Sequence, residues 1–215
     1  MGIPANVHCT QQNRSTTRLF PGPLRFSLYV ASLAKVTQSF GAHYPHYHQY
    51  ANDTYLYIFS NKEEWTTGIH TIEQCTDASY NCLSHNGLAL NTFKSEAIQF
   101  SVAQTRFTKD LKSVNVAGAS IALSPSIKSF GVILDSHLTF DDHVAVVSKA
   151  CYFHIRALRH IRESLPDDVA NTVACSIVSS RLDYCNSLLL GMPETNFSKL
   201  QCIQNTFARV LTGAM

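Results

Sequence analysis

The stretch Tyr50-Ala51-Asn52-Asp53-Thr54-Tyr55-Leu56-Tyr57 sets the expected fold of this chain. It lies between runs rich in apolar and aromatic residues, and this pattern predicts two antiparallel strands joined by a tight turn over residues 46–60. Asn-Asp is ordinary turn chemistry, so one interpretation of Asp53 is a simple turn acid. The other is a metal ligand, because two-metal phosphoryl transfer requires fixed carboxylates around two cations about 3.5–4 Å apart.

The turn resembles the Tyr-Ala-Asp-Asp metal-binding turn of reverse transcriptases, with Asn52 in place of one acid. Five further segments, in matching order along the chain, resemble parts of LINE-type, jockey-like non-LTR retrotransposons. The first, residues 21–29, resembles the end of the palm segment that precedes the hairpin. The others are Leu90-Asn91-Thr92-Phe93-Lys94-Ser95-Glu96, Ile127-Lys128-Ser129-Phe130-Gly131-Val132-Ile133-Leu134-Asp135, and two thumb-like segments at residues 180–189 and 199–209.

This resemblance implies an α+β fold. We expect a partial polymerase palm, an antiparallel hairpin plus helices, over residues 21–135, followed by an all-helical thumb-like region over residues 136–215. Residues 1–20 are polar, lack apolar periodicity and remain unassigned. The implied activity is RNA-directed DNA polymerisation, in which a primer 3′-hydroxyl is extended with the help of two Mg²⁺ ions. The implied partners are an RNA template and a DNA primer.

The resemblance also assigns site residues. Asp53 takes the position of a catalytic metal ligand, whereas Asn52 offers only a neutral amide oxygen at an acid position. Lys94 falls where the family places a lysine near the nucleotide phosphates, and its alternative is a solvated loop lysine. Three helix-spaced basic residues are candidate contacts to the nucleic-acid backbone, or a solvated helix face: Arg156, Arg159 and Arg162.

We expect the chain to be truncated and catalytically inactive. A further carboxylate should come from an earlier palm strand with a Phe-x-x-x-Phe-Asp-like motif, and no such segment precedes residue 21. The sheet is therefore expected to have an open edge where that strand would pair. Missing polymerase parts would have to act in trans. The alternatives are a non-enzymatic module that binds nucleic acid or protein, and a reading frame without selected function.

Composition limits other function classes. The formal net charge is +2 and only 15% of residues are charged, whereas a protein that binds nucleic acid independently normally carries a concentrated basic surface. The seven cysteines form no Cys-x-x-Cys pair, so we expect reduced thiols, mostly in the core. His43, His46 and His48 lack the spacing of a common zinc motif. The absence of a signal-peptide pattern and of a long apolar run predicts an intracellular protein, nuclear or cytoplasmic, without membrane contact.

Periodicity predicts the remaining elements. Helices are expected over residues 24–40 and 63–86, the second closed by Gly87 as its C-terminal cap. Short strands are expected over 96–102 and 111–134, with turns at Asn115, Gly118 and Ser124-Pro125. After Asp141 the pattern indicates helices only, at residues 141–163, 166–180, 181–190 and 195–212.

Overall fold

The structure is a computed structural model that describes residues 3–10, 22–40, 45–51, 53–61, 63–101 and 111–213, with side chains from residue 26 onward within these ranges. Its contacts divide the chain into a first unit, Met1–Ile127, and a second unit, Lys128–Met215. The described residues combine antiparallel sheets with helices, which confirms the α+β class at that level.

The first unit contains a four-stranded sheet in the order β2-β3-β1-β4, in which every neighbouring pair is antiparallel. The strands are β1 (Ile3–Thr10), β2 (His46–Tyr50), β3 (Asp53–Ser60) and β4 (Glu96–Gln99). Helices connect β1 to β2 and β3 to β4, so the chain runs strand-helix-strand-strand-helix-strand. This is the element order of the split βαβ motif.

The predicted hairpin over residues 46–60 is confirmed. β2 and β3 pair with Tyr50 opposite Asp53, and Ala51 at the turn has a φ of 50°. A positive φ is what the tight turns of two-residue hairpins require. Side chains of β3 alternate as strand geometry demands, and the buried ones on one face are Thr54, Leu56, Ile58 and Ser60.

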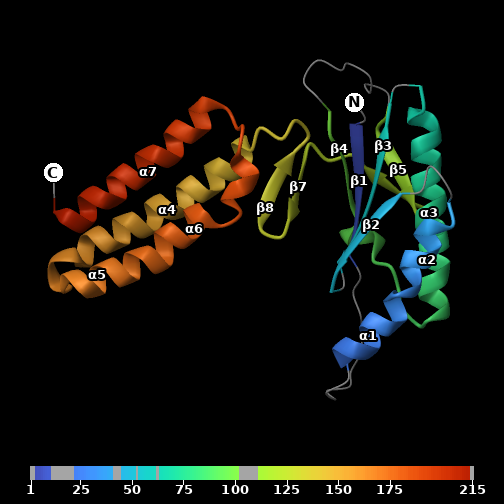
Figure 1. Ribbon diagram of the computed structural model, residues 1–215, viewed down its shortest axis with the longest axis horizontal. Coiled ribbons are helices and arrows are strands. Elements are labelled where there is room, and N and C mark those ends of the chain that lie inside the picture. The colour runs from blue at the N-terminus through green and yellow to red at the C-terminus, as the bar shows by residue number, and fades with distance from the viewer. Residues whose placement is uncertain are drawn as a thin grey trace. The chain divides into compact units, whose positions relative to one another are not determined.

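Helices cover that buried face of the sheet, as Figure 1 shows. The covering helices are α2 (Ser32–Gln38) and α3 (Trp65–His85). α1 (Gly22–Val30) precedes α2, so the helix predicted over 24–40 is interrupted at Ala31. Gly87, with a φ of 71°, follows α3, and the backbone N–H of Leu88 donates to the carbonyl of Leu83, which confirms the predicted cap. Tyr80 on α3 is exposed.

The position of β1 corrects the expectation for the N-terminal residues. The sheet was expected to lack a strand beside the hairpin, but β1 pairs with β3 along its length and with β4 on its other side. Residue 10 lies opposite residue 53, and residue 8 opposite residue 96. The expected open edge next to β3 is therefore absent from the described sheet, because β1 supplies backbone hydrogen bonds to both neighbours.

Residues 111–135 form two small two-stranded sheets. The first pairs β5 (Ser113–Val116) with β6 (Ala119–Ala122), and the second pairs β7 (Ser126–Ser129) with β8 (Val132–Asp135). Asn115 lies inside β5, so the turn predicted there is wrong, and the chain reverses at Ala117 and Gly118 instead. Ile58, Ile72, Val114 and Val116 form the core between the main sheet, α3 and β5.

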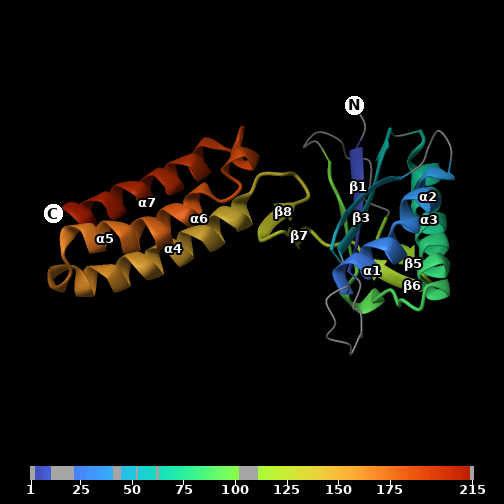
Figure 2. The ribbon, with the colours of Figure 1, turned by 60° about the horizontal axis from the view of Figure 1, so that its bottom comes forward.

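From residue 141 to residue 213 the described chain forms helices and turns, as predicted. Figure 1 shows α4 and α7 side by side, and in the view of Figure 2 the segment of α5 and α6 runs between them. The prediction of a continuous helix over 181–190 is wrong, since Tyr184 is extended and Cys185 has a φ of 54°. The elements are α4 (Asp141–Ile161), η3 (Arg162–Ser164), α5 (Asp167–Ala174), the π-helix η4 (Cys175–Ser179), α6 (Ser180–Asp183), η5 (Asn186–Leu189) and α7 (Glu194–Thr212).

The cysteines and the helices bear on two further predictions. Cys75 and Cys151 are buried, but Cys175 and Cys202 are exposed, so a mainly buried set of thiols is not what the described residues show. The thiols of all six cysteines between residues 75 and 202 are free of disulfides. Within the described ranges, every helix is too short or too polar to cross a bilayer.

Candidate functional site

The candidate polymerase site lies at the end of the sheet where β2 turns into β3. Asp53 is the first residue of β3 and is half-buried. It lies on the sheet face opposite the buried residues Thr54 and Leu56, which places its carboxylate away from α3. Asn52, the residue at the other acid position, lies outside the described residues.

Few carboxylates are near enough to share a metal with Asp53. Asp53 is the first acidic residue of the whole sequence, so β1 contributes none. Glu96 lies on the same face, but β1 separates β4 from β3, which puts the two strands about 10 Å apart at the usual strand spacing. Two Mg²⁺ ions require carboxylates that reach both, so this donor set does not fit the pair. Among the described residues, no three acidic, histidine or cysteine side chains gather as a metal site would require.

The same sheet face carries a cluster of rings. His46 stacks on Tyr57 with ring centroids 5.2 Å apart, and Phe59 meets Tyr57 edge-on at 5.7 Å. His48 lies against Tyr55, with their centroids 6.3 Å apart. These contacts give the two imidazoles a packing role on the face of β2 and β3. His43, the remaining histidine of the predicted trio, lies outside the described residues.

Lys94 lies at the same end of the sheet as Asp53. It ends η2 (Thr92–Lys94), two residues before Glu96, which pairs with residue 8 of β1, and residue 10 of β1 pairs with Asp53. Asn91 caps η2, because its side chain accepts a hydrogen bond from the backbone N–H of Phe93 at 3.2 Å. The structure thus brings two sequence-predicted residues, Asp53 and Lys94, to one end of the sheet with β1 between them.

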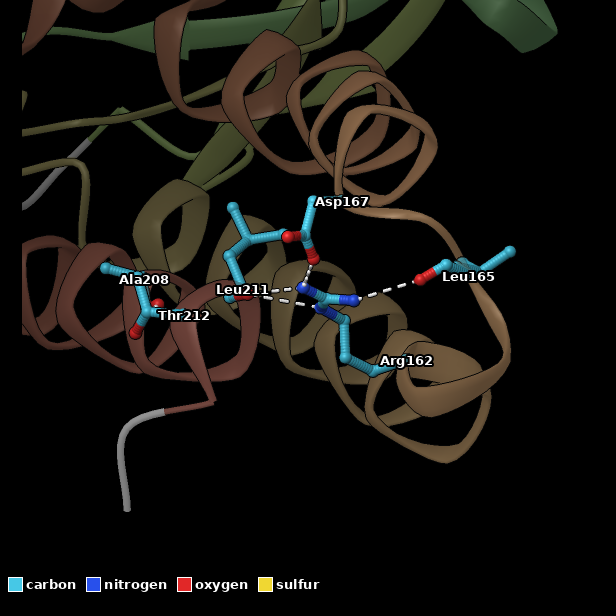
Figure 3. Close-up of polar contacts among 6 residues, drawn as sticks. All are labelled: Arg162, Leu165, Asp167, Ala208, Leu211 and Thr212. Carbon is cyan, nitrogen blue, oxygen red and sulfur yellow. Dashed lines mark hydrogen bonds and ion pairs between the residues drawn. The ribbon is translucent and has the colours of Figure 1, made fainter.

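The three candidate arginines differ in what they contact. Arg156 and Arg159 are exposed on α4, three residues apart, and therefore neighbours on its surface. Arg162 is mostly buried, and Figure 3 shows its guanidinium among carbonyl groups. Its Nε and Nη2 donate to the carbonyl of Leu211 at 3.1 and 2.9 Å, its Nη1 donates to that of Leu165 at 3.1 Å, and its Nη2 also pairs with Asp167. A phosphate would have to compete with these contacts for Arg162.

Sequence patterns gave no role to a groove in the second unit, which has a volume of about 590 Å³. The β7–β8 turn, α4 and the segment from η4 to α6 line it. Tyr184 ties this segment to the turn, since its hydroxyl donates to the carbonyl of Phe130 at 2.6 Å. The lining residues are Lys128, Gly131, His143, Val146, Val147, Ala150, His154, Ser176, Ile177, Ser180, Arg181 and Tyr184.

Burial and charge set the ionisation of groups around this groove. Burial lowers the pKa of His143, so its ring is neutral at pH 7. Its Nδ1 accepts a hydrogen bond from the backbone N–H of Ile133 at 3.4 Å, which leaves the proton of the neutral ring on Nε2. Burial also raises the pKa of the Cys151 thiol, and the positive charge of Arg181 partly opposes that effect.

Comparisons with known proteins identify no relative: no protein-family model, no curated protein and no solved structure matches this chain. The resemblance to non-LTR reverse transcriptases therefore rests on the sequence segments themselves. What the structure adds is local geometry, namely the hairpin with Asp53 at its end, the cap formed by Asn91, the turn held by Asp135 before α4, and the helical second unit.

Proposed function

We propose that this chain derives from the palm and thumb of a LINE-type reverse transcriptase and no longer catalyses nucleotide transfer. One observation carries the catalytic half of the proposal: Asp53 is the only acid of the β2–β3 hairpin, and Glu96, the nearest acid along that end of the described sheet, is two strands away. A polymerase needs its carboxylates close enough to hold two cations together.

The six ordered sequence segments support the derivation, and so does the arrangement around the hairpin. Asp53 and Lys94 lie at one end of an antiparallel sheet whose opposite face is covered by helices. Asp53 lies on the face opposite the described helices, where a long ligand would bind. The contribution of Asp53 to that face is one carboxylate, which repels rather than binds a phosphate chain unless a cation intervenes.

Primer extension tests the loss of catalysis. The purified chain is incubated with an annealed RNA template and DNA primer, all four deoxynucleotides, and Mg²⁺ or Mn²⁺, and we expect no extension above that of an Asp53→Asn variant. An active member of the family serves as a positive control. Template-dependent extension that the Asp53→Asn substitution abolishes would overturn the proposal, because Asp53 would then act with carboxylates from elsewhere.

A second candidate function is non-enzymatic binding of a polynucleotide, which the exposed pair Arg156 and Arg159 favours. Backbone contacts of this kind release counterions, so affinity should fall as salt rises. Fluorescence anisotropy with a labelled RNA–DNA hybrid at several salt concentrations measures the slope. The double substitution Arg156→Gln and Arg159→Gln should flatten that slope by roughly 1 to 2, whereas Arg209→Gln on α7 should leave it unchanged.

A further inference from the structure

We propose that the groove between the β7–β8 turn, α4 and the η4–α6 segment binds a small phosphate monoester that carries an apolar or aromatic group. This inference goes beyond polymerase ancestry, because it concerns a compact ligand and a site that contains neither Asp53 nor the sheet.

The charges that line the groove are all positive. Lys128 and Arg181 contribute two cations, and no Asp or Glu stands among the described residues that line it. Neither cation forms an ion pair with another described residue. A phosphate monoester carries a charge of about −1.5 to −2 at pH 7, which matches two cations better than a carboxylate or a phosphodiester does.

Neutral hydrogen-bonding groups surround these two cations. His143 lines the groove and carries the proton of its neutral ring on Nε2, since its Nδ1 already accepts from the backbone of Ile133. His154 lines the same groove. The hydroxyls of Ser176 and Ser180 donate to backbone carbonyls one helical turn earlier, so only their lone pairs face outward. The N–H donors of the two cations therefore outnumber the acceptor atoms that line the groove, as an anion site requires.

The remaining residues that line the groove are apolar, and they are the reason for proposing an apolar or aromatic group on the ligand. Val146, Val147, Ala150 and Ile177 supply aliphatic surface beside the charged groups. A volume of about 590 Å³ falls inside the roughly 300–1,000 Å³ range of small-molecule sites. Inorganic phosphate alone would leave this surface uncovered, so an attached ring or acyl group should add affinity.

The backbone around the groove departs from regular geometry at two places. Ser176 and Ile177 belong to the π-helix Cys175–Ser179, and single π-turns inside helices occur frequently at functional sites. On the opposite wall, Phe130 has a φ of 47°, which is costly for a bulky side chain. Tyr184 packs over Gly131, so that a Cβ there would meet its ring at 3.5 Å. These features hold the two walls in place.

Isothermal titration calorimetry of the full chain, with EDTA present, tests the proposal. The probes are phenyl phosphate, inorganic phosphate and benzenesulfonate, which keeps the ring but carries a single charge. We expect phenyl phosphate to bind most tightly. Lys128→Gln and Arg181→Gln should each weaken it about tenfold, as expected for the loss of one charge-assisted contact. Arg209→Gln removes the same charge from α7, outside the groove, and should leave binding unchanged.

Further variants and probes distinguish a specific binding site from a surface that attracts any anion. Val146 is exposed on α4, so Val146→Trp should fold, keep every charge and weaken phenyl phosphate by filling the groove. Circular dichroism checks that each variant is folded. Adenosine 5′-monophosphate and a pentanucleotide with a 5′-phosphate distinguish a free phosphate ester from a strand end, and either one supports the proposal if it binds more tightly than the same compound with a 5′-hydroxyl.

Three results would overturn it. The first is no heat from phenyl phosphate at millimolar concentration. The second is equal weakening by Arg209→Gln and Arg181→Gln, which would indicate general electrostatic attraction. The third is equal binding of pentanucleotides with a 5′-phosphate and a 5′-hydroxyl while phenyl phosphate does not bind, which would indicate a polynucleotide surface. Because no primer, nucleotide triphosphate or free metal is present, none of these results depends on the polymerase proposal.

Discussion

Asp135 holds the turn that leads from β8 into α4. Its carboxylate accepts hydrogen bonds from the backbone N–H groups of His137, Thr139 and Phe140 at 3.0, 2.9 and 2.6 Å. Burial raises the pKa of this carboxyl, but these hydrogen bonds lower it, and the net effect is a pKa below 3.8. The Asp at the end of the Lys-Ser-Phe-Gly-Val-Ile-Leu-Asp segment therefore has a structural role in this chain.

The lowered pKa of Asp135 predicts an acid-sensitive turn. Because the unfolded state binds this proton at a higher pH than the folded state, the stabilisation is complete above the unfolded pKa and is lost as pH falls through the folded value. We expect Asp135→Asn to lower stability at pH 7 by about 1–3 kcal/mol. Urea unfolding followed by circular dichroism from pH 7 to pH 2 should show the difference from wild type shrinking below pH 4. A difference independent of pH would contradict the role of the charge.

Phe130 offers a stabilising substitution. Its φ of 47° lies in the left-handed region, next to Gly131 with a φ of 84°, and Asn tolerates that region better than Phe. Phe130→Asn should raise stability by about 1 kcal/mol, since the bond from Tyr184 goes to the backbone carbonyl and survives. Thermal unfolding measures the gain. Phe153→Asn, an exposed position inside α4, should give no gain and serves as the control.

At the scale of elements, Arg162 joins the end of α7 to the start of α5. A single guanidinium satisfies the carbonyl of Leu211 near the C-terminus of α7 and that of Leu165 before α5. Carbonyls in the last turn of a helix have no partner within the helix, and a cation there also interacts favourably with the helix dipole. Arg162 therefore caps the C-terminus of α7 and ties it to the residue that precedes α5.

Removing this cap should be costly. We expect Arg162→Gln to destabilise the helical unit by about 2 kcal/mol, because part-buried carbonyls lose charged donors. Asp167 is 87% exposed, so Asp167→Asn should cost less than about 1 kcal/mol. The control Arg159→Gln, on the exposed face of α4, should stay within about 0.5 kcal/mol. Urea unfolding by circular dichroism compares the three. Equal effects of Arg159→Gln and Arg162→Gln would contradict the cap.

Local patterns predicted some elements and missed others for physical reasons. The hairpin over 46–60 was predictable because runs rich in apolar and aromatic residues flank a short turn. β1 was not, because Pro4 and Asn6 weaken its strand pattern and its pairing is supplied by β3 and β4. The break after Asp183 depends on the tertiary bond from Tyr184 to Phe130, which no local periodicity contains.

Of the candidate site residues, too, the sequence predicted some and missed others. Asp53 and Lys94 were found from short ordered segments, and the structure puts them at one end of a sheet. The groove was missed because Lys128 and Arg181 are far apart in sequence and share no spacing rule. Helical spacing alone made Arg162 a candidate contact to nucleic acid or part of a solvated helix face, and spacing says nothing of whether carbonyl groups already engage its guanidinium.

At the scale of the whole molecule, the two units differ in how local their contacts are. In the first unit residue 5 pairs with residue 99, and in the second each helix forms from neighbouring residues. Non-local pairing slows folding. The single tryptophan, Trp65, packs on the core of the first unit and reports on it alone.

We therefore expect two kinetic phases after dilution from urea. Stopped-flow circular dichroism should regain most of the helical signal before Trp65 fluorescence reaches its native value. Phe130→Asn should leave the rate of the Trp65 fluorescence change unaltered, since residue 130 lies in the second unit and Trp65 in the first. Coincident traces from both probes would show that the chain folds as a single cooperative body and would contradict the division.

The central place of β1 has one more consequence. Loss of a strand at the edge of a sheet exposes the backbone of one neighbouring strand. β1 lies between β3 and β4, so its loss would leave the backbone N–H and C=O groups of both strands without partners, facing an empty slot. A slot of that kind is a template for any extended peptide of suitable pattern. A chain that lacks residues 1–21 should therefore be complemented by a synthetic peptide of residues 3–10, much as a bacterial pilus subunit receives the donor strand of the next.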